Sequence, residues 1–344
     1  MSVLEVKDLK THFPIRQGLL KKLSGKKPEY IRAVDGVDID LQKAEILGIV
    51  GESGCGKSTL SRTILKLIKQ TSGNLLYHDT EITDMPEPLF KPYRRKMQMI
   101  FQDPFGSLNP RRKVSEILGE TIDIHNLAET AEKRHDMIAK SLIEVGLEPV
   151  EEFWNKYPGL LSGGQLQRAS IARVLILQPD FVIADEPVSM LDVSVRIGIL
   201  DLLLQLKERH SISFIYISHD LATARYICDR ISIMYLGKFV ESGPTEDILK
   251  KPAHPYTRAL ISAVPVPDPD VGAPDLPIKG FVNPKGQSNK NACRFSPRCP
   301  YAEPACEEAE PEATVMRGSG TEEHWAACRR VRELPEYIER SERS

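Results

Sequence analysis

The stretch that most constrains the fold is the nonapeptide GESGCGKST at residues 51–59. It follows ILGIV, an apolar run typical of a buried strand, and precedes LSRTILKLI, whose apolar residues recur at helical spacing. A glycine-rich loop between a strand and a helix presents backbone N–H groups and the positive end of the helix dipole to an anion. The pattern GxxxxGKS in this context is the Walker A motif, so the sequence predicts a phosphate-binding loop in an α/β fold.

The residue types of this loop suit phosphate binding. Side chains at the glycine positions would keep backbone N–H groups away from the phosphate oxygens. We expect Lys57 to reach the β and γ phosphates, Ser58 to bind Mg²⁺ and Thr59 to add a hydroxyl near the α phosphate. Cys55 is expected to fill space, without a redox role. The residues expected to line the nucleotide here are Gly51, Ser53, Gly54, Cys55, Gly56, Lys57, Ser58 and Thr59.

Two adjacent carboxylates follow a second apolar run, in FVIADEP at residues 181–187. Side chains alternate across a strand, so the two acids point in different directions. We expect Asp185 to hold Mg²⁺ through water and Glu186 to polarise the water that attacks the γ phosphate. Two acids that merely cap a buried strand are the alternative, and the Walker A motif disfavours it.

Two further polar residues follow predicted strands. Gln102 ends MQMIFQ and is expected to contact Mg²⁺ and water, and to report the nucleotide state to the helical region that follows. His219, in IYISHD, is expected to form a hydrogen bond with the γ phosphate. Alone, each would be interpreted as a loop glutamine or a helix-capping histidine. Their occurrence with the other motifs favours a catalytic role.

The chain divides into three regions. Over residues 1–262, β-rich runs alternate with helical patterns, which is typical of a largely parallel α/β sheet. Residues of about 103–160 interrupt this alternation with mostly helical patterns and predict an inserted helical subdomain. Residues 263–290 are rich in proline and predict a linker. Residues 291–344 then form a small cysteine-rich C-terminal domain.

Composition excludes some function classes. A formal net charge of −2 and a pI near 6.5 do not provide the basic field that holds a protein on nucleic acid. The longest apolar runs, such as VLIL and FVIA, are too short to span a bilayer, and the N-terminus does not resemble a signal peptide. We therefore expect a cytoplasmic protein whose membrane attachment comes through a partner.

Four of the six cysteines gather in the last fifth of the chain, at Cys293, Cys299, Cys306 and Cys328. In a cytosolic chain such a group favours a metal over disulfides. The gaps of five, six and twenty-one residues are not the CxxC pairs of a zinc knuckle. Spacing alone favours Zn²⁺ and an iron–sulfur cluster equally, and four unliganded thiols are the remaining alternative.

Several separated motifs together resemble the ATPase domains of ABC transporters, over about residues 3–262. They occur in that family's order: GESGCGKST, Gln102, LSGGQ at 161–165, FVIADE, SMLD at 189–192 and His219. The resemblance implies ATP hydrolysis with Mg²⁺ in a head-to-tail dimer that holds ATP between its subunits. Met190 and Leu166 depart from the family's usual residues, and neither is expected to abolish hydrolysis.

The LSGGQ segment has a specific role in that family. The resemblance implies that Ser162, Gly163, Gly164 and Gln165 close over ATP bound to the opposite subunit, and that Asp192 crosses the same interface.

Family members also stack adenine on an aromatic residue ahead of the strand that leads into the Walker A motif. Phe13 is favoured here and Tyr30 is the second candidate. Simple packing against the sheet is the alternative for both.

Three longer segments narrow the resemblance to the ATP-binding subunits of oligopeptide and dipeptide importers, most like the second ATPase subunit of the dipeptide type. These segments are QDPFGSLNPR at 102–111, DEPVSMLDVSV at 185–195, and HPYTRALISAVPVPDP at 254–269 followed by CRFSPRCPYAEPAC.

This narrower resemblance implies a set of partners: a second, non-identical ATPase subunit, two transmembrane permeases at whose cytoplasmic face the chain lies, and indirectly an extracellular solute-binding protein. It also favours a [4Fe-4S] cluster over Zn²⁺ at the four cysteines. Peptide is the expected solute, while oligosaccharides or nickel are alternatives. A soluble ABC ATPase is disfavoured because such chains carry two ATPase domains or a long coiled-coil insertion.

Overall fold

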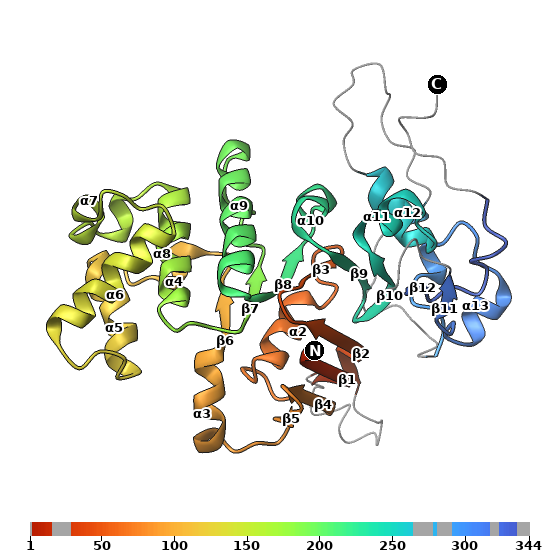
Figure 1. Cartoon of the computed structure of the whole chain (residues 1–344). Helices are drawn as coiled ribbons and strands as arrows, with labels where there is room; N and C mark the ends of the chain where they lie inside the picture. The colour runs from red at the N-terminus through yellow and green to blue at the C-terminus, as the bar shows by residue number, and fades with distance from the viewer. Residues whose placement is uncertain (1, 16–28, 264–277, 281–290, 317–322, 336–344) are drawn as a thin grey trace. The chain divides into compact units, whose positions relative to one another are not determined.

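The chain forms two compact units whose segments interleave along the sequence (Figure 1). The computed structural model describes residues 2–15, 29–263, 278–280, 291–316 and 323–335. Unit 1 comprises residues 1–3, 41–46 and 84–217, and unit 2 comprises residues 4–40, 47–83 and 218–344.

Unit 1 contains a parallel sheet with strands β6 (Met97–Ile100), β7 (Phe181–Asp185) and β8 (Ser213–Ser218), in the order β8-β7-β6. Every residue of β7 and β8 is buried, as expected for strands covered on both faces. Its helices are α3 (Glu87–Lys96), α4 (Pro104–Ser107), α5 (Val114–Ile124), α6 (Ala131–Glu144), α7 (Val150–Trp154), the 3-10 turn η1 (Pro158–Leu160), α8 (Gly163–Leu175) and α9 (Val193–His210).

Helix α8 is the packing centre of unit 1. It contacts α4, α5, α6, α9 and strand β6, and nine of its thirteen residues are buried. Helix α6 begins at a capping threonine, because the Thr130 hydroxyl accepts a hydrogen bond from the Lys133 N–H at 3.2 Å. Its buried residues, Ile138 and Leu142 among them, recur at helical spacing. Helices make up much of the segment 103–160, and this segment belongs to the same compact unit as β6, β7 and β8.

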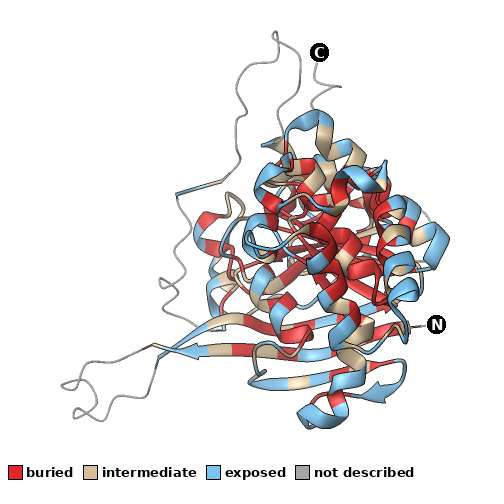
Figure 2. Cartoon of the chain, turned by 90° about the vertical axis from the view of Figure 1, so that its left-hand side faces the viewer, coloured by how far each residue is buried: buried red, intermediate tan, exposed pale blue. Residues whose placement is uncertain are grey.

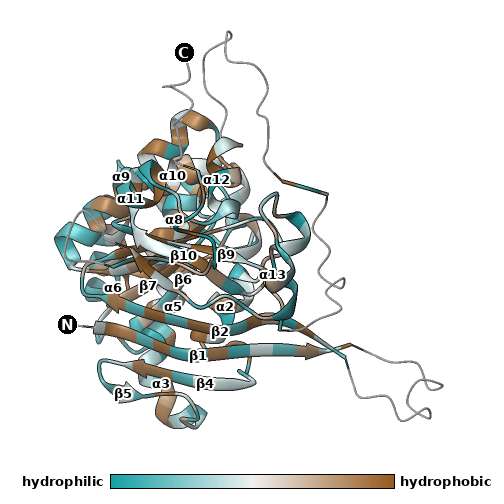
Figure 3. Ribbon diagram, turned by 90° about the vertical axis from the view of Figure 1, so that its right-hand side faces the viewer, coloured by the Kyte–Doolittle hydropathy of each residue, from teal (hydrophilic) through white to brown (hydrophobic). Residues whose placement is uncertain are grey.

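Unit 2 contains a four-stranded sheet in the order β2-β1-β4-β5, formed by β1 (Ser2–Pro14), β2 (Tyr30–Gln42), β4 (Ser72–Tyr77) and β5 (Thr80–Glu81). Strands β1 and β4 pair antiparallel. Buried positions alternate with less buried ones along much of β1 and β2 (Figure 2). Apolar and polar residues alternate there too (Figure 3), which is the pattern of a sheet with one covered face.

The second sheet of unit 2 follows the order β11-β12-β10-β9-β3. Strand β3 (Ile46–Val50), fully buried, pairs parallel with β9 (Arg230–Tyr235), and β9 pairs antiparallel with β10 (Lys238–Pro244). Two short C-terminal strands, β12 (His324–Ala326) and β11 (Thr314–Met316), continue this sheet beyond β10. The helices are α2 (Lys57–Ile64), α10 (Leu221–Ile227), α11 (Thr245–Lys250), α12 (Pro255–Ser262), α13 (Pro304–Glu308) and the 3-10 turn η2 (Ser296–Arg298).

The predicted α/β class is confirmed by these sheets and helices. Most of the predicted linker, residues 264–277 and 281–290, lies outside the described residues. The cysteine-bearing segment is joined to unit 2 through the pairing of β12 with β10. Within the described ranges, no helix combines the length and the apolar character that crossing a bilayer requires.

Candidate functional site

The glycine-rich loop lies between the end of β3 and the first residue of α2, as predicted. Gly56 precedes α2 with a φ of 115°, a left-handed conformation that L side chains rarely adopt. A Cβ atom there would lie 2.1 Å from the Ala33 carbonyl oxygen, and one at Gly51 would lie 2.2 Å from the Met234 carbonyl oxygen. Only glycine fits either position, so the backbone itself forms the cradle.

Lys57 is the first residue of α2 and is buried. Its Nζ donates to two carbonyl oxygens of the same loop, Gly51 O at 2.6 Å and Glu52 O at 3.1 Å. The side chain of Ser58, next in sequence, is exposed. The ammonium group and this hydroxyl are therefore both held at the start of α2, where the helix dipole favours an anion.

Cys55 is buried in the same loop, and burial raises the pKa of its thiol. A thiol with a raised pKa is protonated at neutral pH and is a weak nucleophile. Its environment therefore agrees with the expectation of a space-filling residue.

His219 follows β8 and is exposed. The next residue begins α10, because the Asp220 carboxylate accepts a hydrogen bond from the Ala222 N–H at 2.8 Å. The residue that caps α10 is therefore Asp220, and not His219 as the alternative interpretation of that histidine would require.

Phe13 and Tyr30 lie on the hairpin formed by β1 and β2, where the Ile15 N–H donates to the Glu29 carbonyl oxygen at 2.8 Å. Phe13 is 38% exposed and Tyr30 is 47% exposed. The structure thus brings both candidate aromatics to the same end of one hairpin, with exposed ring surface on each, and it does not separate the two candidates for stacking on adenine.

Gln102 and Glu186 come together in unit 1. They follow the parallel strands β6 and β7, and parallel strands bring their carboxyl ends to the same edge of a sheet. The Gln102 Nε2 donates to the Glu186 Oε2 at 2.9 Å, a direct contact that the sequence did not predict. Glu186 has a φ of 47°, which is rare for a residue with a side chain and is typical of functional sites. Asp185, one residue earlier, is buried at the end of β7.

The SGGQ residues begin helix α8. The Ser162 hydroxyl accepts from the Gln165 N–H at 3.3 Å, and the Gln165 side-chain oxygen accepts from the Ser162 N–H at 3.1 Å. This reciprocal capping box fixes the first turn of the helix. A Cβ atom at Gly164 would lie 2.5 Å from a methyl group of Val195 on α9, so glycine allows the two helices to approach closely.

The start of α9 and the residues just before it present both polar and apolar side chains. Asp192 is the N-cap residue of α9, is exposed, and makes no capping hydrogen bond with its side chain. Met190, Val193 and Ile197 are 59%, 73% and 50% exposed. Asp192 thus stands beside exposed apolar surface, which is the composition of a surface that contacts another protein.

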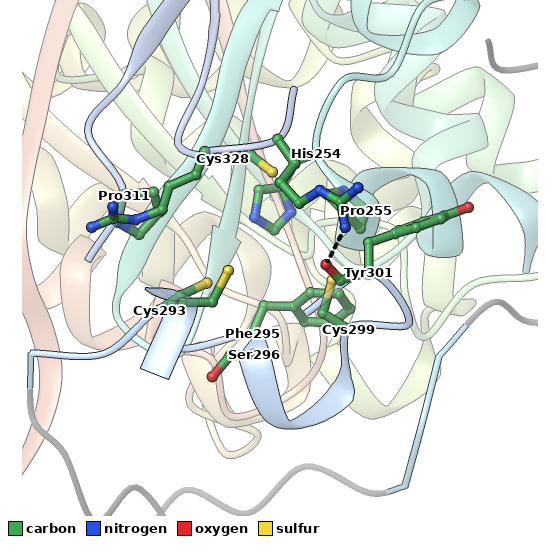
Figure 4. A pocket seen from close by; sticks show the side chains of 12 residues that line it. His254, Pro255, Cys293, Phe295, Ser296, Cys299, Tyr301, Pro311 and Cys328 are labelled. Carbon is green, nitrogen blue, oxygen red and sulfur yellow. Dashed lines mark hydrogen bonds between the residues drawn. The ribbon is translucent and has the colours of Figure 1, made fainter. Parts of the chain in front are cut away.

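The four C-terminal cysteines, Cys293, Cys299, Cys306 and Cys328, line one pocket, together with side chains from α12 and the turn η2 (Figure 4). Among them, the N–H of Cys293 donates to the carbonyl oxygen of Cys306 at 2.9 Å. Burial raises the pKa of Cys293 and of Cys328 to about 11 and also raises that of Cys299. Within the part of the chain that the structure describes, no three His, Cys, Asp or Glu side chains are grouped closely enough to hold a metal ion.

Sequence reasoning missed the residues that contact Glu52 in the glycine-rich loop. The Arg298 guanidinium donates to both carboxylate oxygens of Glu52, at 2.8 and 3.0 Å, and the Glu52 N–H donates to the Tyr256 hydroxyl at 2.9 Å. Arg298 and Glu52 are 246 residues apart. No spacing pattern reports a contact at that separation, although an arginine beside a cysteine and a glutamate inside the loop were visible in the sequence.

Family models match two parts of the chain. Residues 34–189 match the model described as "ABC transporter", and residues 240–306 match the one described as "Oligopeptide/dipeptide transporter, C-terminal region".

Close relatives match nearly the whole chain. It is 43% identical to the oligopeptide transport ATP-binding protein AppF of Bacillus subtilis, covering 95% of this chain and 97% of AppF. It is 42% identical to the oligopeptide transport ATP-binding protein OppF of Escherichia coli, covering 96% of each. The putative oligopeptide transport ATP-binding protein YkfD of Bacillus subtilis is 42% identical, over 91% of this chain and 92% of that protein.

Solved structures also resemble the chain. The dimeric structure of MJ0796, a bacterial ABC transporter cassette, superposes with a TM-score of 0.60 at 28% identity, covering 70% of this chain and 98% of that one. The structure of cbiO1 from Clostridium perfringens, part of the ABC transporter complex cbiONQ, has a TM-score of 0.61 at 24% identity, covering 72% and 90%. At that identity the second likeness concerns the fold alone.

Proposed function

The chain belongs to the family of oligopeptide ABC transporter ATP-binding proteins, and from that premise we propose how its residues drive peptide uptake. It is an ATPase of the ABC type that couples ATP binding and hydrolysis to the import of oligopeptides or dipeptides. The observation that carries the catalytic assignment is the contact of Gln102 with Glu186 at 2.9 Å, at the carboxyl edge of a buried parallel sheet.

The glycine-rich loop binds the phosphates of ATP. The loop can take its shape only with glycine at residues 51 and 56, because a Cβ atom at Gly51 or Gly56 would collide with a backbone carbonyl. Lys57 exchanges its two loop carbonyl partners for phosphate oxygens. The remaining contacts come from Ser53, Gly54, Cys55, Ser58 and Thr59, with Phe13 stacking on adenine and Tyr30 as the alternative.

Ser58, Gln102 and Asp185 would hold Mg²⁺ through their side-chain oxygen atoms, because oxygen donors are what this ion prefers. The Gln102 amide suits the task because its nitrogen donates to Glu186 while its oxygen stays available for the ion. When bound, Mg²⁺ neutralises charge on the phosphates. Glu186 accepts a proton from the attacking water, and His219 donates a hydrogen bond to the γ phosphate.

Ser162, Gly163, Gly164, Gln165 and Asp192 act on ATP held by another subunit. Support comes from the exposed apolar side chains beside Asp192 and from the capping box that holds the SGGQ backbone rigid. The MJ0796 cassette is described as dimeric. We infer that the partner is a second, homologous ATPase subunit in a heterodimer.

The helices of residues 103–160 form the subdomain that transmits closure to two transmembrane permeases. Exposed apolar side chains on these helices support a docking role: Phe105 is 56% exposed, Ile124 62% and Leu160 70%. The chain therefore sits on the cytoplasmic face of the membrane, and an extracellular solute-binding protein delivers the peptide. Residues 1–262 form the nucleotide-binding domain, 263–290 the linker and 291–344 the cysteine-rich C-terminal domain.

The four cysteines would hold a [4Fe-4S] cluster, with Zn²⁺ as the alternative. Their convergence on one pocket, with four thiols as donors, fits either group. Among the described residues these side chains are not grouped closely enough to hold a metal ion as they stand, so binding of either group would have to draw the thiols together. The raised pKa values mean that these thiols are protonated at neutral pH, so a bound metal would displace their protons. Ligation by several cysteines would also cross-link this segment.

Purification of the tagged chain from native membranes in mild detergent tests the assembly. We expect two polytopic permeases and a second, non-identical ATPase in equal amounts with the chain. Recovery of soluble proteins only would rule out the importer function. Recovery of permeases without a second ATPase would indicate a homodimer in place of the heterodimer.

A further inference from the structure

Arg298 connects the cysteine-bearing segment to the phosphate-binding loop within unit 2. Its two terminal nitrogens donate to the two carboxylate oxygens of Glu52, at 2.8 and 3.0 Å. This is the parallel two-bond geometry in which arginine binds a carboxylate most specifically. Glu52 is the second residue of the Walker A stretch, directly after Gly51. A residue near the C-terminal end of the chain therefore contacts the loop that binds phosphate.

The Arg298 side chain is buried and fixed by its neighbours. It is 6% exposed, and its guanidinium lies 5.8 Å from the centre of the Tyr235 ring. An arginine side chain stays protonated at neutral pH, so its contact with the Glu52 carboxylate is an ion pair. Its remaining nitrogen, Nε, is buried with no hydrogen-bond partner. Leaving that atom unsatisfied is unfavourable, and the contact with Glu52 offsets it.

Glu52 is held at three points. Arg298 holds its carboxylate, its N–H donates to the Tyr256 hydroxyl at 2.9 Å, and its carbonyl oxygen accepts from Lys57 Nζ at 3.1 Å. Tyr256 is 1% exposed and packs against Tyr235, with ring centres 4.6 Å apart. The position of Glu52 therefore determines one of the two carbonyl contacts of the lysine that binds the β and γ phosphates.

We propose that Arg298 is a positioning residue for ATP binding: it neutralises and holds Glu52, and so keeps a carboxylate of the Walker A loop away from Lys57 and from the phosphates. The proposal rests on the proposed function, because it assumes that this loop binds ATP. Without Arg298, the Glu52 carboxylate is an unpaired negative charge beside a triphosphate site. It then pairs with Lys57 and repels the nucleotide.

The place of Arg298 in the chain gives this contact a second consequence. Arg298 ends the turn η2, where its N–H donates to the Phe295 carbonyl oxygen at 2.9 Å, and Cys299 follows it directly. Cys299 and Phe295 both line the four-cysteine pocket. The turn that places Arg298 against Glu52 is thus the turn that places Cys299 in that pocket.

The test is a double-mutant cycle on the full chain, with the dissociation constant for Mg-ATP measured by titration calorimetry. We expect Arg298→Gln to raise that constant about tenfold, within the range of typical couplings between sites. Adding Glu52→Gln to that variant removes the unpaired charge, so the double variant is expected to return to within about twofold of the wild-type constant. A purely structural arginine would not be rescued in this way.

Arg330→Gln is the matched control, since Arg330 lies in the same C-terminal segment and also pairs with a carboxylate, that of Glu333, at 3.2 Å. It is expected to keep the wild-type constant, and thermal melting checks that every variant is folded. A folded Arg298→Gln chain with unchanged affinity, a double variant as weak as Arg298→Gln, or equal weakening by Arg330→Gln would each overturn the proposal. Failure of the wild-type chain to bind Mg-ATP would instead refute the proposed function.

Discussion

Replacing Glu186 with glutamine separates its catalytic role from its structural one. The substitution keeps the shape of the side chain and an oxygen that can accept from the Gln102 Nε2, so the 2.9 Å contact survives as a neutral hydrogen bond. A hydrogen bond to a charged group contributes about 1.5–3 kcal/mol and a neutral one about 0.5–1.5 kcal/mol, so the free energy of unfolding should fall by roughly 1–1.5 kcal/mol.

The expected effect on turnover is much larger. Loss of a general base lowers a rate by about 10²–10⁴-fold, which corresponds to about 2.7–5.5 kcal/mol of barrier. We expect ATP hydrolysis by the assembled transporter to fall by at least about a hundredfold, with unchanged ATP binding measured by calorimetry. In a heterodimer the second site adds its own turnover, so its equivalent glutamate must be replaced in the same preparation.

Glu87→Gln is the control, because Glu87 is an exposed glutamate of unit 1 that pairs with Arg94 on α3, outside the predicted catalytic residues. It should hydrolyse ATP at the wild-type rate. Hydrolysis that persists in Glu186→Gln above about a tenth of the wild-type rate would remove Glu186 from the role of base. Loss of ATP binding would show that the residue is structural.

Three further substitutions test other parts of the site. Gly164→Ala places a methyl group 2.5 Å from Val195 and should lower the free energy of unfolding by about 1–2 kcal/mol in denaturant titrations, whereas Gly159→Ala, with open space around it, should not. Cys328→Ser should abolish iron and the broad absorbance near ~400 nm in anaerobically purified protein, and a wild-type chain lacking both would refute the cluster. Burial lowers the pKa of His254 to about 3, so the folded state resists protonation and stability falls as pH drops below the unfolded value near 6.5. Between pH 7 and 5 the free energy of unfolding should fall by about 2 kcal/mol because of this histidine. His254→Asn keeps a cap acceptor for α12 but does not titrate, so its free energy of unfolding should fall by about 2 kcal/mol less than that of the wild type over the same range. An identical pH dependence of the two proteins would contradict the assignment.

The local parts of the site were predictable from sequence because each is a short motif on one element. The Walker A loop needs a strand, a helix and glycines within a few residues, and the structure places all of these at residues 46–64. The same holds for the carboxylates that end β7 and for the serine that caps α8. Periodicity and capping chemistry act over one or two turns, so a single sequence reports them.

Contacts between distant segments were not predictable in the same way. The hydrogen bond from Gln102 to Glu186 depends on β6 pairing with β7, and the pairing of β12 with β10 depends on strands of only three and seven residues. The contact of Arg298 with Glu52 depends on how an irregular segment packs. None of these has a repeating pattern, because each is decided by packing between elements.

Uptake by the reconstituted transporter shows whether ATP turnover by this chain drives peptide import. The purified complex is placed in liposomes that enclose Mg-ATP, with the solute-binding protein and a labelled oligopeptide outside. We expect peptide to accumulate inside only with ATP, and we expect Glu186→Gln in this chain, paired with the equivalent change in its partner, to abolish accumulation. A complex that hydrolyses ATP yet accumulates nickel or an oligosaccharide, and no peptide, would contradict it.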